Sequence, residues 1–213
     1  MPAFDPQLLA VYTLAAVALS LTPGPDMLLC FASGLGGGPR AGLAASAGVG
    51  TALLLHTVAM TLGFAGLVAA SPVALDLLRW AGAAYLLWAA WNAFRAGPAG
   101  LGTVAPTAQR AALLAVYRRG LLTCLLNPKL LLFMLAFLPQ FVRPEAGSMA
   151  VQFLVLSLIL FVPGFLVNAA VGVSAGGLGR WLLRRPLWAR VQNWLVGTIF
   201  VALALRLVAA PRG

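Results

Sequence analysis

Charged residues are scarce in this chain, and acidic residues are the scarcest. Of 213 residues only 4 are Asp or Glu and 14 are Lys or Arg, which makes 8% charged residues and a formal net charge of +10. A soluble domain carries about 25% charged residues. Because 62% of this chain is hydrophobic, the composition predicts a polytopic membrane protein instead.

The chain also has little of what metal sites and hydrolases require. It holds one histidine and two cysteines, and Cys30 and Cys124 both fall in apolar segments, where small packing roles are expected. The phosphate-loop pattern Gly-x-x-x-x-Gly-Lys-Ser/Thr is missing, so ATP is not the expected energy source. Gly-x-Ser-x-Gly and His-Glu-x-x-His are missing too. We therefore expect no cofactor, no metal ion and no enzymatic activity.

The excess of basic residues follows the ends of the apolar segments, which is the positive-inside pattern and not that of a nucleic-acid-binding protein. The more basic side is predicted to be cytoplasmic, with both termini on the external, periplasmic side. Residues 1–7 carry no Lys or Arg, so the first span is expected to stay in the mature protein. The arginines assigned to the cytoplasmic side are Arg40, Arg95, Arg110, Arg118, Arg119, Arg180, Arg184, Arg185 and Arg190.

The predicted fold is all-α, because the chain contains six apolar segments long enough to cross a membrane as helices of about 20 residues. Gly34–Pro39 is predicted to be a tight turn after the first of them, and residues 96–109, rich in Gly and Pro, a linker. The six predicted spans are Leu8–Phe31, Gly42–Ala69, Val73–Phe94, Leu121–Val142, Met149–Val173 and Val191–Val208.

The linker divides a single transmembrane transporter domain, residues 1–213, into two halves of three spans. Repeat 1 covers about 7–95, the cytoplasmic linker about 96–112 and repeat 2 about 113–210. Three is an odd number, so the second half enters the membrane inverted relative to the first. Pro23 in the first span corresponds to Pro128 in the fourth, and paired broken helices in inverted repeats indicate a transporter's binding site near the bilayer midplane.

Both broken spans combine proline with polar residues: Thr22-Pro23-Gly24-Pro25-Asp26 in the first and Asn127-Pro128-Lys129 in the fourth. A proline inside a helix costs about 3 kcal/mol, and a lysine deep in a membrane helix costs about 2.5–3.5 kcal/mol. Lipid satisfies neither, so these groups are expected to face a cavity or another helix. Two such breaks indicate a substrate pathway.

Lys129 offers a fixed positive charge for a substrate carboxylate. Gln140 follows eleven residues later, three helical turns, and is predicted to share its face of the fourth span with Phe133 and Ala136 between them. The alternative is that Lys129 extends to the nearer membrane interface.

Asp26 is the acid that lies well inside an apolar segment, where a carboxyl group suits proton coupling or contact with substrate. The alternative role is to cap the short helix that follows the Pro-Gly-Pro break. The two roles are compatible.

His56 and Asn168 each lie on a face of small residues, where membrane helices approach one another closely. Gly48, Ala52, Ala59 and Gly63 share the face of His56, which is expected to point into the bundle, and Gly164 and Gly172 share that of Asn168. Either side chain serves as a helix–helix hydrogen bonder or takes part in transport. The same faces would also suit a homodimer.

These residues resemble the LysE/RhtB family of bacterial amino-acid exporters. The resemblance is carried by the Pro-Gly-Pro-Asp run, by His56, by Gly82-Ala83-Ala84-Tyr85-Leu86, and by Asn127-Pro128-Lys129 followed by Pro139-Gln140-Phe141. It is strong from about Leu19 to Val142 and weaker beyond. The chain departs from the family pattern at Asp26, where many members have Asn, and at Ala90, where glycine is usual.

The resemblance implies secondary active, proton-coupled efflux of amino acids or their derivatives across the bacterial inner membrane, working by alternating access. The expected partners are a small zwitterion, protons and the lipid bilayer. The residues expected to bind substrate or couple transport are Pro23, Gly24, Pro25, Asp26, His56, Asn127, Pro128, Lys129, Gln140 and Asn168. The alternative function is a membrane-embedded scaffold or enzyme, in which the proline kinks only shape the bundle.

Overall fold

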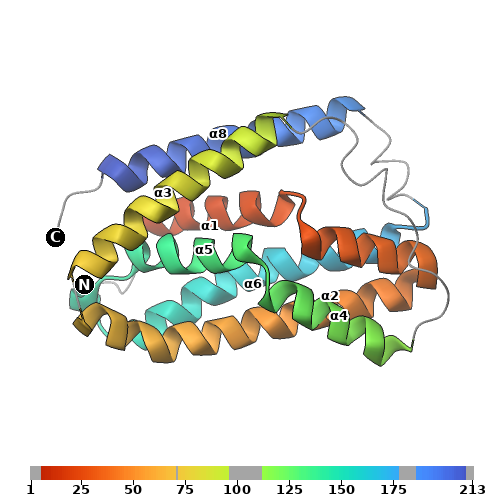
Figure 1. Ribbon diagram of the computed structural model, residues 1–213, viewed down its shortest axis with the longest axis horizontal. Helices are drawn as coiled ribbons and strands as arrows, with labels where there is room; N and C mark the ends of the chain where they lie inside the picture. The colour runs from red at the N-terminus through yellow and green to blue at the C-terminus, as the bar shows by residue number, and fades with distance from the viewer. Residues whose placement is uncertain (1–5, 71, 96–111, 178–185, 210–213) are drawn as a thin grey trace.

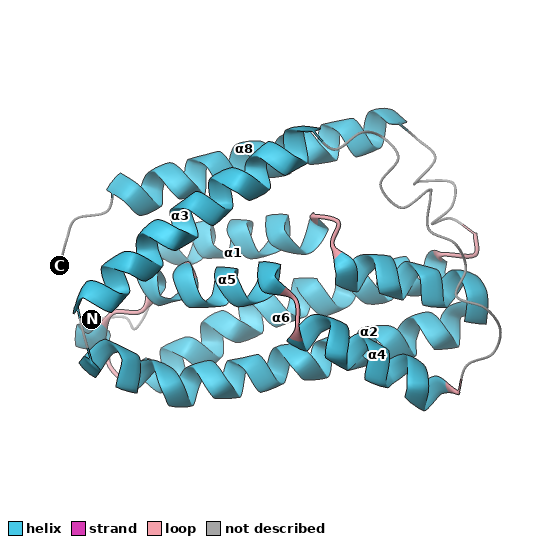
Figure 2. Ribbon diagram, in the orientation of Figure 1, coloured by secondary structure: helices cyan, strands magenta, loops and turns pink. Residues whose placement is uncertain are grey.

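The computed structural model describes residues 6–70, 72–95, 112–177 and 186–209, and within those ranges it is helical, with no strand (Figures 1 and 2). The expected cytoplasmic linker falls almost wholly outside the described residues. The elements, in chain order, are α1 (Pro6–Leu21), α2 (Pro25–Ala70), α3 (Pro72–Arg95), α4 (Leu113–Leu125), α5 (Pro128–Ala136), the short 3-10 helices η1 (Leu138–Phe141) and η2 (Pro144–Ala146), α6 (Met149–Ser174) and α8 (Pro186–Ala209).

Both predicted helix breaks are confirmed. α1 ends at Leu21 and α2 begins at Pro25; α4 ends at Leu125 and α5 begins at Pro128. In each case the new helix starts on a proline, which suits the first helical position because its missing N–H would have no intrahelical acceptor there. The helical segments on either side of the second break meet at 50°.

The predicted turn at Gly34–Pro39 is narrower than expected. The helix continues through Gly37, and only Gly38 leaves helical geometry, with φ 78 and ψ -177. Glycine adopts positive φ without steric cost, and Pro39 then starts the next segment with a suitable φ. α2 is thus two helical segments that meet at Gly38, and in Figure 1 the second returns along the molecule beside the first.

The fourth predicted span, Leu121–Val142, also differs from the structure. α4 begins earlier, at Leu113, and α5 ends at Ala136. Pro139 and Gln140 lie in the separate 3-10 helix η1. The helical spacing that would place Lys129 and Gln140 on one face therefore does not hold, because the helix between them ends.

The core of the bundle forms where α2 packs against α6 and α4, while α3 packs against α8 and α1 against α6. Small residues permit the closest approaches. A Cβ on Gly42 would lie 2.3 Å from the main-chain oxygen of Gly172, and a Cβ on Gly120 would lie 2.2 Å from that of Ala45. Gly172, on the predicted small-residue face of α6, thus packs against the backbone of α2, while Gly48, on the predicted face of α2, packs against the backbone of α4 at Tyr117.

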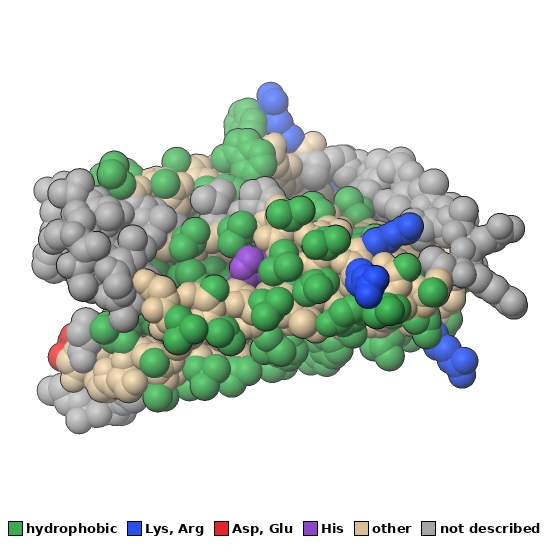
Figure 3. All heavy atoms as spheres, turned by 60° about the horizontal axis from the view of Figure 1, so that its bottom comes forward, with side chains coloured by type: hydrophobic (Ala, Val, Ile, Leu, Met, Phe, Trp, Pro, Cys, Tyr) green, Lys and Arg blue, Asp and Glu red, His purple; other side chains and the backbone are tan. Residues whose placement is uncertain are grey.

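Hydrophobic side chains also cover most of the described surface in Figure 3, as expected where lipid replaces water. By length and hydropathy, two helical stretches among the described residues qualify as membrane spans, Pro25–Gly63 and Met149–Ser174. The bent pair Leu113–Leu125 and Lys129–Phe141 makes a third if it is taken as one span. The full set of six spans stays a prediction.

Candidate functional site

The two helix breaks, far apart in the sequence, lie against each other in the fold. The side-chain Nδ2 of Asn127 donates a hydrogen bond to Oδ2 of Asp26 at 2.7 Å. The ammonium group of Lys129 donates to the main-chain oxygen of Thr22 at 3.0 Å. Each break thus supplies a polar partner to the other, so neither has to be satisfied by lipid.

Both polar atoms of the Asn127 side-chain amide form hydrogen bonds in this arrangement. Its Oδ1 accepts a hydrogen bond from the main-chain N–H of Lys129 at 3.0 Å, which makes it the N-cap of α5. Its Nδ2 is then left to donate to Asp26. The side chain is buried, with 2% exposure, and the orientation of its amide is fixed by these two bonds.

Asp26 lies in the first turn of α2, one residue beyond Pro25. Negative charge is favourable there because the helix dipole places partial positive charge at its N-terminus. The capping role considered for Asp26 does not hold, because α2 already begins at Pro25 and the carboxyl group accepts its hydrogen bond from Asn127. The second oxygen of Asp26, Oδ1, is buried without a hydrogen-bond partner among the described residues, with the Cys124 thiol beside the carboxyl group.

Lys129 does not extend away from the site toward an end of the molecule. Its ammonium group meets the Thr22 carbonyl just past the last turn of α1, where main-chain oxygens lack intrahelical donors and cations are favoured. The side chain crosses directly over Gly24. A Cβ at Gly24 would lie 2.9 Å from Nζ and 3.3 Å from Cε of Lys129, so the glycine leaves room for the lysine.

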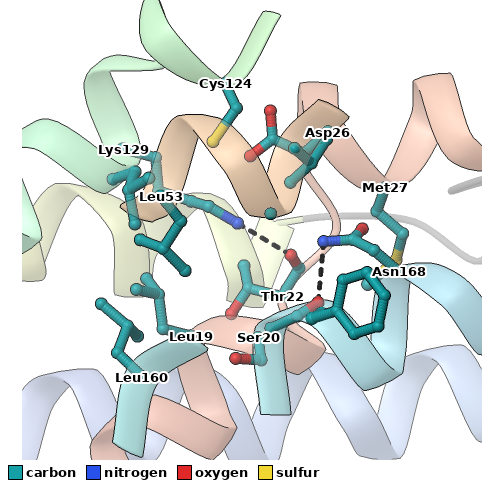
Figure 4. Close-up of a pocket in the computed structure, with 15 residues that line it drawn as sticks. Leu19, Ser20, Thr22, Asp26, Met27, Leu53, Cys124, Lys129, Leu160 and Asn168 are labelled. Carbon is teal, nitrogen blue, oxygen red and sulfur yellow. Dashed lines mark hydrogen bonds between the residues drawn. The ribbon is translucent and has the colours of Figure 1, made fainter. Parts of the chain in front are cut away.

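A cavity of about 50 Å³ lies beside this junction (Figure 4). It is lined from both halves of the chain, with the carboxyl group of Asp26 and the ammonium group of Lys129 in a mainly apolar wall. The lining residues are Leu19, Ser20, Thr22, Asp26, Met27, Val49, Gly50, Leu53, Cys124, Lys129, Leu130, Leu160, Gly164, Phe165 and Asn168.

Asn168, one of the candidate residues selected from the sequence, belongs to this wall. Its Nδ2 donates to the main-chain oxygen of Gly164 at 2.9 Å, within α6, while its Oδ1 is buried without a partner among the described residues. Ser20, from α1, lines the same cavity and donates its hydroxyl to the Ala16 carbonyl at 2.7 Å.

His56 and Gln140 lie outside the set of residues that line the cavity. His56 is half-buried, and Figure 3 shows it reaching the surface, so it does not point wholly into the bundle. Its Nε2 is nevertheless buried without a hydrogen-bond partner in the described part of the chain. Gln140 lies in η1, partly buried.

The sequence did not single out Thr22's main-chain oxygen or the wall position of Cys124. Main-chain acceptors carry no residue signal, although the end of a helix before Pro-Gly-Pro predicts unsatisfied carbonyls. Cys124, expected to be a packing residue, is 1% exposed and lines the cavity. Within the described residues no group of three or more His, Cys, Asp or Glu side chains could hold a metal ion.

Comparison with known proteins places this geometry in context. Residues 17–210 match the model of the LysE type translocator family. The chain is 32% identical over 200 residues to a homoserine/homoserine lactone efflux protein of Salmonella typhi, covering 93% of this chain and 95% of that protein. It is 31% identical over 205 residues to a leucine efflux protein of Enterobacter sp. (strain 638), covering 93% of each. No solved structure matches the chain.

Proposed function

The chain belongs to the LysE type translocator family, and from this premise we propose that it exports amino acids or close amino-acid derivatives across the bacterial inner membrane. Two of its relatives carry the names of amino-acid efflux proteins, one for homoserine and its lactone and one for leucine. These are names of transporters and not of enzymes. The substrate class is taken from them together with the chemistry of the cavity.

The observation that carries the proposal is the junction of the two helix breaks beside a cavity whose wall includes one basic side chain, Lys129, and one acidic side chain, Asp26. An amino acid is a zwitterion, and Lys129 and Asp26 offer the two opposite charges that it requires. The rest of the wall is mainly apolar, which strengthens electrostatic interactions by excluding water.

In this proposal the substrate carboxylate displaces the Thr22 carbonyl as the partner of Lys129. Asp26 faces the substrate amino group or carries the exchanging proton. Asn127 and Pro128 hold Lys129 in place, while Pro23, Gly24 and Pro25 keep the opposite backbone open. His56 and Gln140, which lie outside the cavity wall, make no direct contact with the substrate in this proposal.

Transport would proceed by alternating access between two inverted repeats of three helices. The helix contacts support this, because α2 packs on α6 and α3 on α8, while α1 contacts α6 and α4 contacts α2. Exchanging α1 with α4, α2 with α6 and α3 with α8 reproduces that pattern. The cavity of about 50 Å³ is smaller than the roughly 300–1,000 Å³ of ligand pockets, so the substrate requires the helices to separate.

The direct test is efflux from proteoliposomes preloaded with labelled leucine, homoserine, threonine and lysine, with and without an imposed pH gradient. The proposal predicts saturable export of a subset, accelerated by the gradient. Export of no member of the panel by correctly folded, inserted protein would reject it. Equal, non-saturable leakage of all four would indicate a channel.

A further inference from the structure

The polar side chains that line the cavity differ in how many of their donors and acceptors are already hydrogen-bonded. The two hydroxyls and the amide that line it already donate to main-chain carbonyls: Ser20 to Ala16, Thr22 to Ala18 at 2.8 Å and Asn168 to Gly164. A hydroxyl whose hydrogen is engaged in this way can only accept further bonds, whereas the Asn168 amide keeps its carbonyl oxygen and one N–H. Among these three side chains, acceptors therefore outnumber free donors.

Two of these acceptors are buried and lack partners among the described residues: Oδ1 of Asp26 and Oδ1 of Asn168. The orientation of the Asn168 amide is settled by chemistry, because the Gly164 carbonyl can accept only from Nδ2. Asn168 is 9% exposed, so its oxygen has little access to bulk water. A buried acceptor left unpaired is costly, which indicates that a donor occupies this place at some stage of the cycle.

The two oxygens come from opposite halves of the chain, Asp26 on α2 and Asn168 on α6, and both residues line one small cavity (Figure 4). The Cys124 thiol beside Asp26 is only a weak donor and does not replace a full hydrogen bond. A primary ammonium group carries three donors and no acceptor. It would complement the two open oxygens and the lone pairs of Ser20.

We propose that Asn168 and Asp26 form a subsite for the substrate's unsubstituted ammonium group, so that the protein selects solutes with a free primary amine and rejects N-acylated ones. This rests on the proposed export of amino acids and goes further by assigning the amine end of the substrate to a specific pair of residues. Lys129, which also lines the cavity, is then left for the carboxylate end of the substrate. Recognition by Asn168 should therefore depend on the substrate's amine more than on its carboxylate.

The test uses full-length protein in proteoliposomes and follows exchange of labelled leucine and labelled homoserine against three competitors: leucine, leucinamide and N-acetylleucine. Leucinamide keeps the amine and loses the carboxylate, whereas N-acetylleucine does the reverse. The subsite predicts that leucinamide competes and that N-acetylleucine competes at least about tenfold more weakly than leucine, the size of one lost hydrogen bond to a charged group. Equal competition by N-acetylleucine would overturn the inference without any mutation.

Asn168→Ala should raise the half-saturating concentration of the amino acids at least about tenfold and should reduce competition by leucinamide by a similar factor. Ser157→Ala is the matched control: this buried serine lies on the same helix, also has an unpaired oxygen, and stands outside the cavity wall. It should leave both values unchanged. An unchanged half-saturating concentration in folded Asn168→Ala would overturn the inference.

If Asn168→Ala fails to fold, Asn168→Asp retains the shape and the acceptor and should keep the preference for free amines. Loss of that preference in Asn168→Asp would count against the subsite. The proposed function fails separately. If the wild-type protein exchanges neither amino acid, both proposals fall; if it exchanges them and Asn168→Ala exchanges them equally well, only the subsite falls.

Discussion

Lys129 donates its ammonium group to the main-chain oxygen of Thr22, 3.0 Å away, across a sequence separation of 107 residues. The bond joins the start of α5 to the end of α1, so a charge that would be unfavourable in lipid is placed on a helix end that needs a cation. Because only one hydrogen bond joins the ammonium group to Thr22, a substrate carboxylate can compete for it. In the proposed mechanism this contact is the resting position of the group that binds the substrate carboxylate.

Asp26→Asn tests the proposed role of the carboxyl group in coupling. Asparagine can still accept the hydrogen bond from Asn127 through its own Oδ1, so the fold should be preserved, but it cannot exchange a proton. We expect substrate exchange to continue at equal pH on both sides, while acceleration by a pH gradient is lost. Export by Asp26→Asn at the wild-type rate, with unchanged pH dependence, would show that Asp26 does not couple transport to protons.

Gly24→Ala should reduce transport with little loss of stability. The new Cβ would meet Nζ of Lys129 at 2.9 Å, and the flexible lysine can move away, which removes its ammonium group from Thr22 and from the site. We expect the rate of exchange to fall about tenfold or more, the cost of one charge-assisted hydrogen bond. Gly63→Ala is the control, because a Cβ there meets nothing within 4 Å. Equal exchange by the two variants would contradict the prediction.

Gly42→Ala should instead lower stability. Its Cβ would lie 2.3 Å from the oxygen of Gly172, which is main chain and cannot rotate aside, so α2 and α6 must separate. Overpacking of this kind costs about 1–3 kcal/mol. Thermal unfolding in detergent should give a lower Tm for Gly42→Ala than for wild type, while Gly63→Ala stays close to wild type. A Tm for Gly42→Ala equal to that of wild type would show that the helices tolerate the wider spacing.

Cys124 is a native thiol in the cavity wall, so the cavity can be probed with a thiol reagent without introducing a cysteine. It is 1% exposed in this closed arrangement but lines the cavity, so alternating access should expose it intermittently to a small thiol reagent. In a Cys30→Ser background, saturating substrate should slow the reaction of Cys124 with methyl methanethiosulfonate. A reaction rate that is the same with and without substrate would place the substrate elsewhere.

The helix breaks could be predicted from the sequence because proline and glycine act locally. Pro25 and Pro128 each begin a helix, as their chemistry requires, and Gly38 provides the positive φ of a predicted turn. The early end of α5 at Ala136 was not anticipated, because Pro139 disrupts the helix before its own position is reached. That is why Gln140 does not continue the face of Lys129.

The pairing of residues across the two halves could not be predicted. The sequence marked Asp26, Asn127, Lys129 and Asn168 as separate polar residues in apolar segments, and only helix packing decides that Asn127 faces Asp26. Spacing along one helix predicts a shared face, but no pattern gives the register between two helices distant in sequence. His56 illustrates the limit: its small-residue face is packed near Gly48 and exposed at Gly63, so the histidine between them is half-buried.

The most direct test of the central claim is exchange of labelled leucine and homoserine by wild-type protein and by Lys129→Gln in proteoliposomes. Glutamine can still donate to the Thr22 carbonyl, so it preserves a link between the breaks while removing the charge offered to a carboxylate. The account predicts saturable exchange by the wild type and a loss of at least about tenfold in Lys129→Gln at unchanged Tm. Wild-type exchange by Lys129→Gln would contradict the claim that the junction of the two breaks is where an amino acid binds.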